Sequence, residues 1–196
     1  MATREDLLSA LRRNAPREVP LPDLSALGAR FADPPARYVE ALAAVGGTCL
    51  RVPDLAAADR ALRELEPWRG AKRTVSLVAG VGEGSVDLAT VGAPRELEGL
   101  DVAVLPGELA VAENGAVWVA AAELPQRAVF VITEHLVLVV PASAVVQDMH
   151  EAYARIAARP VAYGLFIAGP SKTADIEQAL VIGAHGARSC TVLVVP

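Results

Sequence analysis

Cysteine is scarce in this sequence, which holds only Cys49 and Cys190. Two thiols are too few for an iron–sulfur cluster or a cysteine-rich zinc site. Each lies in an apolar, strand-like run, so we expect both to pack as small core side chains of a reduced protein, without a disulfide. The three histidines include no pair at the i, i+4 spacing with which one helix face binds a metal. We therefore expect no metal site and no cofactor in this chain.

The sequence also lacks an excess of positive charge, a secretory signal and a membrane span. Its 18 Lys and Arg against 23 Asp and Glu give a net charge of −5, which argues against nucleic acid as a partner. The first residues are polar, unlike a signal peptide. The most apolar stretch, 128–146, is interrupted by Glu134, His135 and Pro141 and alternates as strands do. We expect a cytoplasmic protein.

What is present is enough apolar sequence for one compact domain, since 53% of the 196 residues are hydrophobic. Residues 3–14 carry an N-cap threonine and a leucine face typical of a short amphipathic helix. Residues 15–35 are rich in proline and indicate an extended connector. The predicted organisation is therefore an N-terminal helix and connector over 1–35 and an α/β domain over 36–196.

Helical and strand-like patterns alternate from residue 36 onward. This alternation predicts an α/β fold with a mostly parallel central sheet flanked by helices, to which the stretch 116–140 adds antiparallel strands. The clearest unit comes last: a strand at 165–168, a helix at 173–182 capped by Gly183, and a strand at 191–195, together a βαβ unit. The other expected elements are helices at 36–45, 55–65 and 145–158 and strands at 48–52, 74–79, 102–105, 116–120 and 135–140.

Three of the strand-like runs end in glycine-rich turns: 75–79, 102–105 and 165–168. The carboxyl ends of strands line the ligand crevice in open parallel sheets, so we expect these turns to share one edge. The last turn leads into the predicted helix, whose unpaired N–H groups would hold an anion. An ordinary capped helix start is the competing interpretation. The candidate ligand-binding residues of this segment are Gly169, Ser171, Lys172, Thr173 and Asp175.

A second candidate is the Glu113-Asn114-Gly115 turn between two apolar runs, where Asn-Gly tolerates a positive φ. The plain interpretation is a hairpin turn with a solvated glutamate. The alternative is a fixed carboxylate that acts as nucleophile or general base, with Asn114 and Gly115 beside the ligand. His185 follows the predicted helix 173–182, so it either stabilises the helix C-terminus or reaches back into the crevice.

The same segments resemble a known family. The run from Gly169 to Glu177, followed by Leu180-Val-Ile-Gly-Ala-His-Gly186, closely resembles the signature of the LUD-domain family, which includes the lactate-utilisation protein C group. Ala112-Glu-Asn-Gly-Ala resembles the family's upstream Ala-Glu-Thr-Gly motif. The sequence departs from the family at Lys172, where arginine is expected, and at Asn114, where threonine is usual.

The resemblance implies the fold group of ribose-phosphate isomerase, glucosamine-phosphate deaminase and the CoA transferases. It also implies participation in oxidising L-lactate to pyruvate, as the cluster-free subunit beside iron–sulfur partner proteins. Glu113-Asn-Gly further resembles the motif that bears the glutamate nucleophile in some CoA transferases. The alternative function is therefore a stand-alone enzyme acting on a small carboxylic acid, a sugar phosphate or an acyl-CoA, with Glu113 as the catalytic carboxylate.

Overall fold

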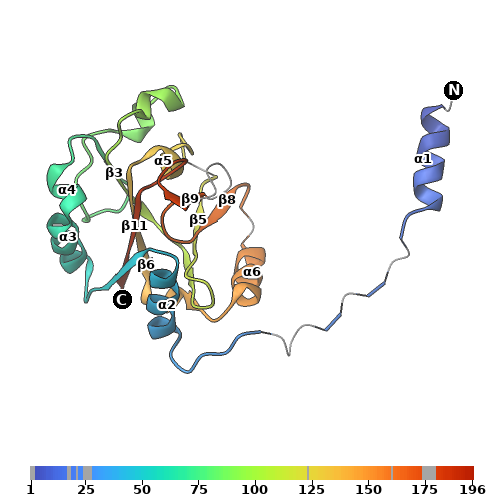
Figure 1. The fold of residues 1–196 in the computed structure, drawn as a ribbon, viewed down its shortest axis with the longest axis horizontal. Coiled ribbons are helices and arrows are strands. Elements are labelled where there is room, and N and C mark those ends of the chain that lie inside the picture. The colour runs from blue at the N-terminus through green and yellow to red at the C-terminus, as the bar shows by residue number, and fades with distance from the viewer. Residues whose placement is uncertain are drawn as a thin grey trace.

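The computed structural model describes residues 3–16, 19–20, 22–23, 28–122, 124–159, 161–173 and 180–196, and Figure 1 shows their arrangement. The α-helices are α1 (Arg4–Arg13), α2 (Pro34–Ala44), α3 (Leu55–Glu64), α4 (Glu66–Gly70), α5 (Val129–Ile132) and α6 (Met149–Ala158). Short 3-10 helices are η1 (Leu88–Thr90), η2 (Pro94–Leu97) and η3 (Ala142–Ala144). The strands are β1 (Thr48–Arg51), β2 (Thr74–Ser76), β3 (Val102–Pro106), β4 (Leu109–Val111), β5 (Val117–Ala120), β6 (His135–Pro141), β7 (Val145–Val146), β8 (Gly164–Ile167), β9 (Lys172–Thr173), β10 (Val181–Ile182) and β11 (Ser189–Val195).

The central sheet is entirely parallel and has five strands in the order β1-β11-β6-β3-β2. β11 pairs with β6 from Ser189 opposite His135 to Val195 opposite Pro141. Both strands are buried along nearly their whole length, which explains why each is a continuous apolar run rather than an alternating one. The prediction of an α/β fold with a mostly parallel central sheet is confirmed.

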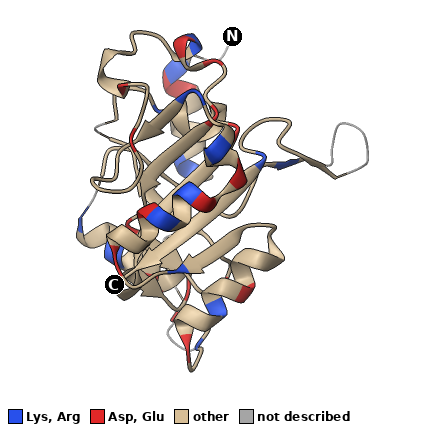
Figure 2. Ribbon diagram, turned by 90° about the vertical axis from the view of Figure 1, so that its left-hand side faces the viewer, with Lys and Arg blue, Asp and Glu red and all other residues tan. Residues whose placement is uncertain are grey.

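The two faces of the central sheet are covered differently. Val137 and Val139 face the side on which Leu62 of α3 packs. Leu136 and Leu138 point to the opposite side, because side chains alternate along a strand, and join the larger core beneath α2 and a second sheet. Figure 2 shows that charged residues are concentrated on the helices and loops, so the strands of the central sheet are largely uncharged.

The second sheet has four strands in the order β7-β4-β5-β8. β5 pairs antiparallel with β4 and with β8, where Val117 lies opposite Ile167. The predicted βαβ unit is therefore wrong, because β8 lies in this sheet and β11 in the central one. The glycine-rich turn after β8 also does not share the carboxyl edge of the central sheet with the turns after β2 and β3. The local sequence identifies β8 as a strand, but residues far away in the chain determine which strand it pairs with.

The predicted helix 173–182 is wrong at both of its ends. Thr173 of β9 pairs antiparallel with Val181 of β10, and Lys172 pairs with Ile182. Three of these four residues are β-branched, which favours extended backbone, and the ladder between them replaces the expected helical hydrogen bonds. The intervening segment 174–179, and with it the candidate Asp175, lies outside the described residues.

The helix predicted at 145–158 begins later than expected, at Met149. Its N-cap is Asp148, whose side chain accepts a hydrogen bond from the Glu151 N–H at 2.8 Å. Residues 145–146 instead form β7, which pairs in parallel with β4. The polar cap, rather than the apolar periodicity, marks the helix start.

The N-terminal helix forms as predicted but no residue of α1 is buried. Thr3 and Asp6 form the capping box that starts it, and Figure 1 shows α1 standing apart from the rest of the fold. The chain contacts the domain before residue 36: Arg30 Nη1 lies 3.1 Å from Asp148 Oδ2, and the Phe31 N–H donates to the Gln147 side chain at 2.8 Å. Over the part of the chain described, no helix combines the length and the apolarity that crossing a membrane requires.

Cys49 on β1 and Cys190 on β11 are free thiols packed against the core, as predicted. Burial raises the pKa of Cys49 to about 11 and that of Cys190 to about 12. Both thiols therefore stay protonated near neutral pH and are weak nucleophiles and poor metal ligands.

Candidate functional site

The Glu113-Asn114-Gly115 turn connects β4 to β5. The Asn114 side chain accepts a hydrogen bond from the Ala116 N–H at 3.0 Å, which fixes the turn from within. Glu113 Oε2 accepts a hydrogen bond at 3.0 Å from the N–H of Met149, the first residue of α6. A carboxylate at a helix N-terminus stabilises the helix dipole. The exposed Glu113 side chain is therefore positioned as a helix cap.

Two glycines bring the predicted motifs together on α2. Gly115 and Gly169 have φ of +73° and +72°. A Cβ on Gly115 would lie 2.7 Å from the Leu42 backbone, and one on Gly169 would lie 2.5 Å from the carbonyl oxygen of Val45. Because β5 and β8 are neighbours, the turns that contain these glycines lie at the same end of that strand pair. The two motifs thus pack side by side against the C-terminal half of α2.

Lys172 caps the C-terminus of α2 and does not lie at the start of a helix. Its Nζ donates hydrogen bonds to the carbonyls of Val45 at 2.6 Å and Pro170 at 3.1 Å. Val45 is the C-cap of α2, where carbonyl groups lack partners within the helix. Ser171, Lys172 and Thr173 therefore do not lie at the predicted helix N-terminus, because Lys172 and Thr173 are paired as strand β9, and anion binding by these residues stays a prediction.

Ser171 and His185 do lie along one cavity, of about 260 Å³, together with Gly169. The Ser171 N–H donates to the Ala187 carbonyl at 2.8 Å, and the Gly183 N–H donates to the Ser171 carbonyl at 3.0 Å. These bonds fold the segment before β11 back onto the Gly169-Pro-Ser turn. The structure thus brings Gly169, Ser171 and His185 together, whereas Glu113 lies beside α6 and Lys172 is directed to α2.

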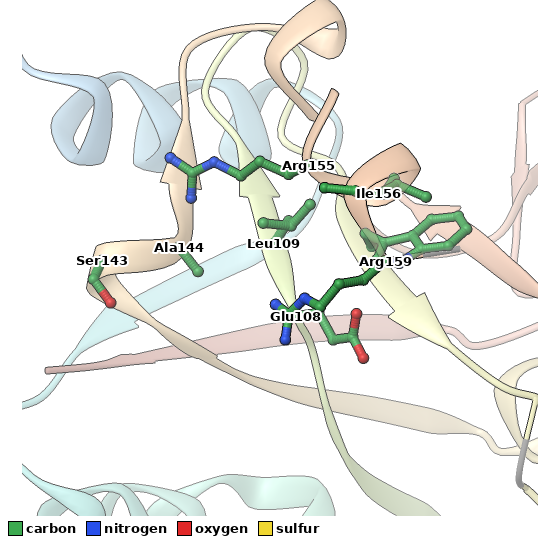
Figure 3. A pocket seen from close by; sticks show the side chains of 9 residues that line it. Glu108, Leu109, Ser143, Ala144, Arg155, Ile156 and Arg159 are labelled. Atoms are coloured by element: carbon green, nitrogen blue, oxygen red, sulfur yellow. The ribbon is translucent and has the colours of Figure 1, made fainter. Parts of the chain in front are cut away.

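A larger cavity, of about 390 Å³, lies elsewhere and was not predicted from the sequence (Figure 3). Arg155 Nη2 donates to Glu151 Oε1 at 2.7 Å, whereas the side chain of Arg159 has no hydrogen-bond or ion-pair partner among the described residues. The available sequence signal was the i, i+4 spacing of these arginines near the end of a predicted helix, which is common by itself. The lining residues are Glu108, Leu109, Trp118, Ser143, Ala144, Arg155, Ile156, Ala158 and Arg159.

Comparison with known proteins places these features in a family. Residues 76–195 match the family model of the LUD domain. The chain belongs to the LUD domain family. All the candidate site residues predicted from the sequence, from Glu113 to His185, lie inside the matched range, but α2, on which two of the motifs pack, precedes it.

Curated relatives of this LUD domain chain are named lactate utilization protein C. The protein from Geobacillus kaustophilus (strain HTA426) is 31% identical over 164 residues, 79% of this chain and 65% of the relative. That from Shouchella clausii (strain KSM-K16) is 30% identical over 106 residues, 51% of this chain and 46% of the relative. This chain thus spans less than two thirds of the length of these two relatives. The protein from Geobacillus thermodenitrificans (strain NG80-2) is 28% identical over 204 residues, 98% of this chain and 80% of the relative.

The fold of this LUD domain also has a match among solved structures. The crystal structure of a DUF162 family protein from Deinococcus radiodurans aligns with a TM-score of 0.57 at 18% identity, over 90% of this chain and 100% of the other. The two proteins therefore share the same overall α/β fold.

Proposed function

We propose that this LUD domain protein is a component of bacterial lactate utilisation that acts in the cytoplasm. The observation that carries the proposal is the match of residues 76–195 to the LUD domain, joined to relatives named lactate utilization protein C. Within that role, the chain is the cluster-free subunit, and iron–sulfur partner proteins carry the electrons as L-lactate is oxidised to pyruvate. The two cysteines support this division of labour, because both are protonated thiols packed in the central sheet.

The alternative function is a stand-alone enzyme that uses Glu113 as its catalytic carboxylate. The geometry of Glu113 favours the first proposal. Its carboxylate is exposed and accepts a hydrogen bond from the Met149 N–H, an arrangement that stabilises α6. A catalytic carboxylate would instead need partial burial and donors converging on its reacting oxygen.

Deletion of the gene in the organism that encodes it tests the proposal. We expect loss of growth on L-lactate, unchanged growth on pyruvate, and restoration by the intact gene. Pyruvate is the matched control because it is the product of the proposed oxidation. Lactate-dependent dye reduction by the purified partner proteins, measured with and without this chain, then shows whether the chain acts in the same assembly. Equal growth on L-lactate in both strains would contradict the proposal.

A further inference from the structure

The larger of the two cavities described above lies where two adjacent parallel strands end. β3 and β6 are neighbours in the central sheet, with Pro106 opposite Val139. Glu108 follows the end of β3, and Ser143 follows the end of β6. Open parallel sheets bind their ligands outside the carboxyl ends of such strands. The cavity therefore has the position of a ligand site, and its volume of about 390 Å³ is that of a small-molecule pocket.

The charged side chains that line this cavity favour a ligand in which an anionic group is adjacent to a hydrogen-bond donor. Figure 3 shows Arg155, Arg159, Glu108 and Ser143 among the residues that line the cavity. Glu151 holds Arg155 by an ion pair of 2.7 Å, which leaves the Arg159 guanidinium as the one without a side-chain partner among the residues that the structure describes. A guanidinium group binds a carboxylate through two parallel hydrogen bonds. Glu108 accepts hydrogen bonds and repels a second negative charge.

The wall of the cavity is apolar and rigid. Leu109, Trp118 and Ile156 supply it. The ring of Trp118 packs against that of Phe166, with the centroids 4.9 Å apart, so the indole is fixed before any ligand arrives. A fully hydrated ion such as phosphate gains nothing from such a wall, whereas the carbon chain of an organic acid is desolvated by it.

We propose that this cavity binds a small 2-hydroxycarboxylate. Arg159 binds the carboxylate, Glu108 accepts a hydrogen bond from the neighbouring hydroxyl group, and the carbon chain packs on Trp118 and Ile156. The proposal deepens the proposed function and rests on it only for the choice of L-lactate as the first probe. Acids with a longer apolar chain fill more of the wall, so they bind more tightly than lactate.

Calorimetric titration of the full chain tests the site with L-lactate, with 2-hydroxy-4-methylpentanoate, with 4-methylpentanoate and with inorganic phosphate. We expect saturation by both hydroxy acids, the longer one binding more tightly, with dissociation constants of roughly millimolar or below. Arg159→Ala weakens binding by roughly tenfold or more, the loss expected for a charged hydrogen-bonding partner. Arg60→Ala is the matched control, because Arg60 is an exposed arginine on α3, which packs on the other face of the central sheet.

The variant Glu108→Ala tests whether the site is specific for hydroxy acids or binds carboxylates in general. The wild-type protein prefers 2-hydroxy-4-methylpentanoate over 4-methylpentanoate, and Glu108→Ala abolishes that preference. Thermal melts of each variant establish that it is folded. The inference is overturned if no organic acid saturates the protein, if Arg159→Ala binds as wild type, or if phosphate binds as tightly as the acids. If no acid binds but the deletion strain fails to grow on L-lactate, this site is rejected and the proposed function stands. If the acids bind but the deletion strain grows normally on L-lactate, the proposed function is rejected and the site stands.

Discussion

At the scale of single residues, the backbone at Gly115 shows how closely a motif turn approaches α2. This glycine combines a positive φ with a neighbouring backbone where a side chain would have to fit. Gly80 has a similar φ of +78° but nothing within 4 Å of the position of a Cβ. The comparison separates the cost of the dihedral angle from the cost of crowding α2.

We predict that Gly115→Ala lowers the free energy of unfolding by about 3 kcal/mol and Gly80→Ala by about 1 kcal/mol. Both substitutions place alanine at a left-handed φ, but only the first displaces α2. Urea denaturation of the two variants measures the difference. Equal losses would mean that α2 moves aside at no cost and that its contact with the turn is loose.

Glu113 is the residue at which the sequence and the structure suggest different roles. We predict that Glu113→Gln changes the free energy of unfolding by no more than about 0.5 kcal/mol, because an amide oxygen still accepts the bond from the Met149 N–H. Lactate-dependent dye reduction by the reconstituted proteins is expected to stay at the wild-type rate. A large loss of that rate in a variant of normal stability would restore Glu113 as the catalytic carboxylate.

At the scale of elements, two segments before α2 differ in their contacts. No residue of α1 is buried, whereas the segment at Arg30 and Phe31 contacts the residues at the start of α6. Arg30 pairs with Asp148, whose side chain is only 2% exposed. Asp148 is also the N-cap of α6. The segment at Arg30 and Phe31 therefore supports the helix that carries Arg155 and Arg159.

We predict that removal of residues 1–14, which contain α1, leaves the melting temperature of the domain unchanged, whereas Arg30→Ala in the full chain lowers stability by about 1 kcal/mol. The loss is modest because the guanidinium is 67% exposed, although its carboxylate partner is buried. Arg12→Ala, on α1, is the control and is expected to have no effect. Thermal melts report both changes, and a drop on removing residues 1–14 would show that α1 packs on the domain.

At the scale of the whole molecule, the sequence predicts the fold class but not how the strands divide between two sheets. The alternation of helix and strand signals is local, and the buried runs at β6 and β11 are unmistakable. The pairing of Val117 with Ile167 is not local, so β8 was assigned to the wrong sheet. The motif turns were found from their residue types, but their meeting on α2 and the cavity at Arg159 depend on segments far apart in the chain.

The position of β11 has a consequence for biosynthesis. β11 is the last described element to leave the ribosome, yet it lies between β1 and β6 in the middle of the central sheet. Until residues 189–195 emerge, β1 has no partner in that sheet, and β6 exposes one edge. Unpaired edges of this kind recruit other chains during translation. The nascent protein therefore completes its central sheet only after β11 has emerged, and a chaperone that shields β1 and β6 until then would raise its folding yield.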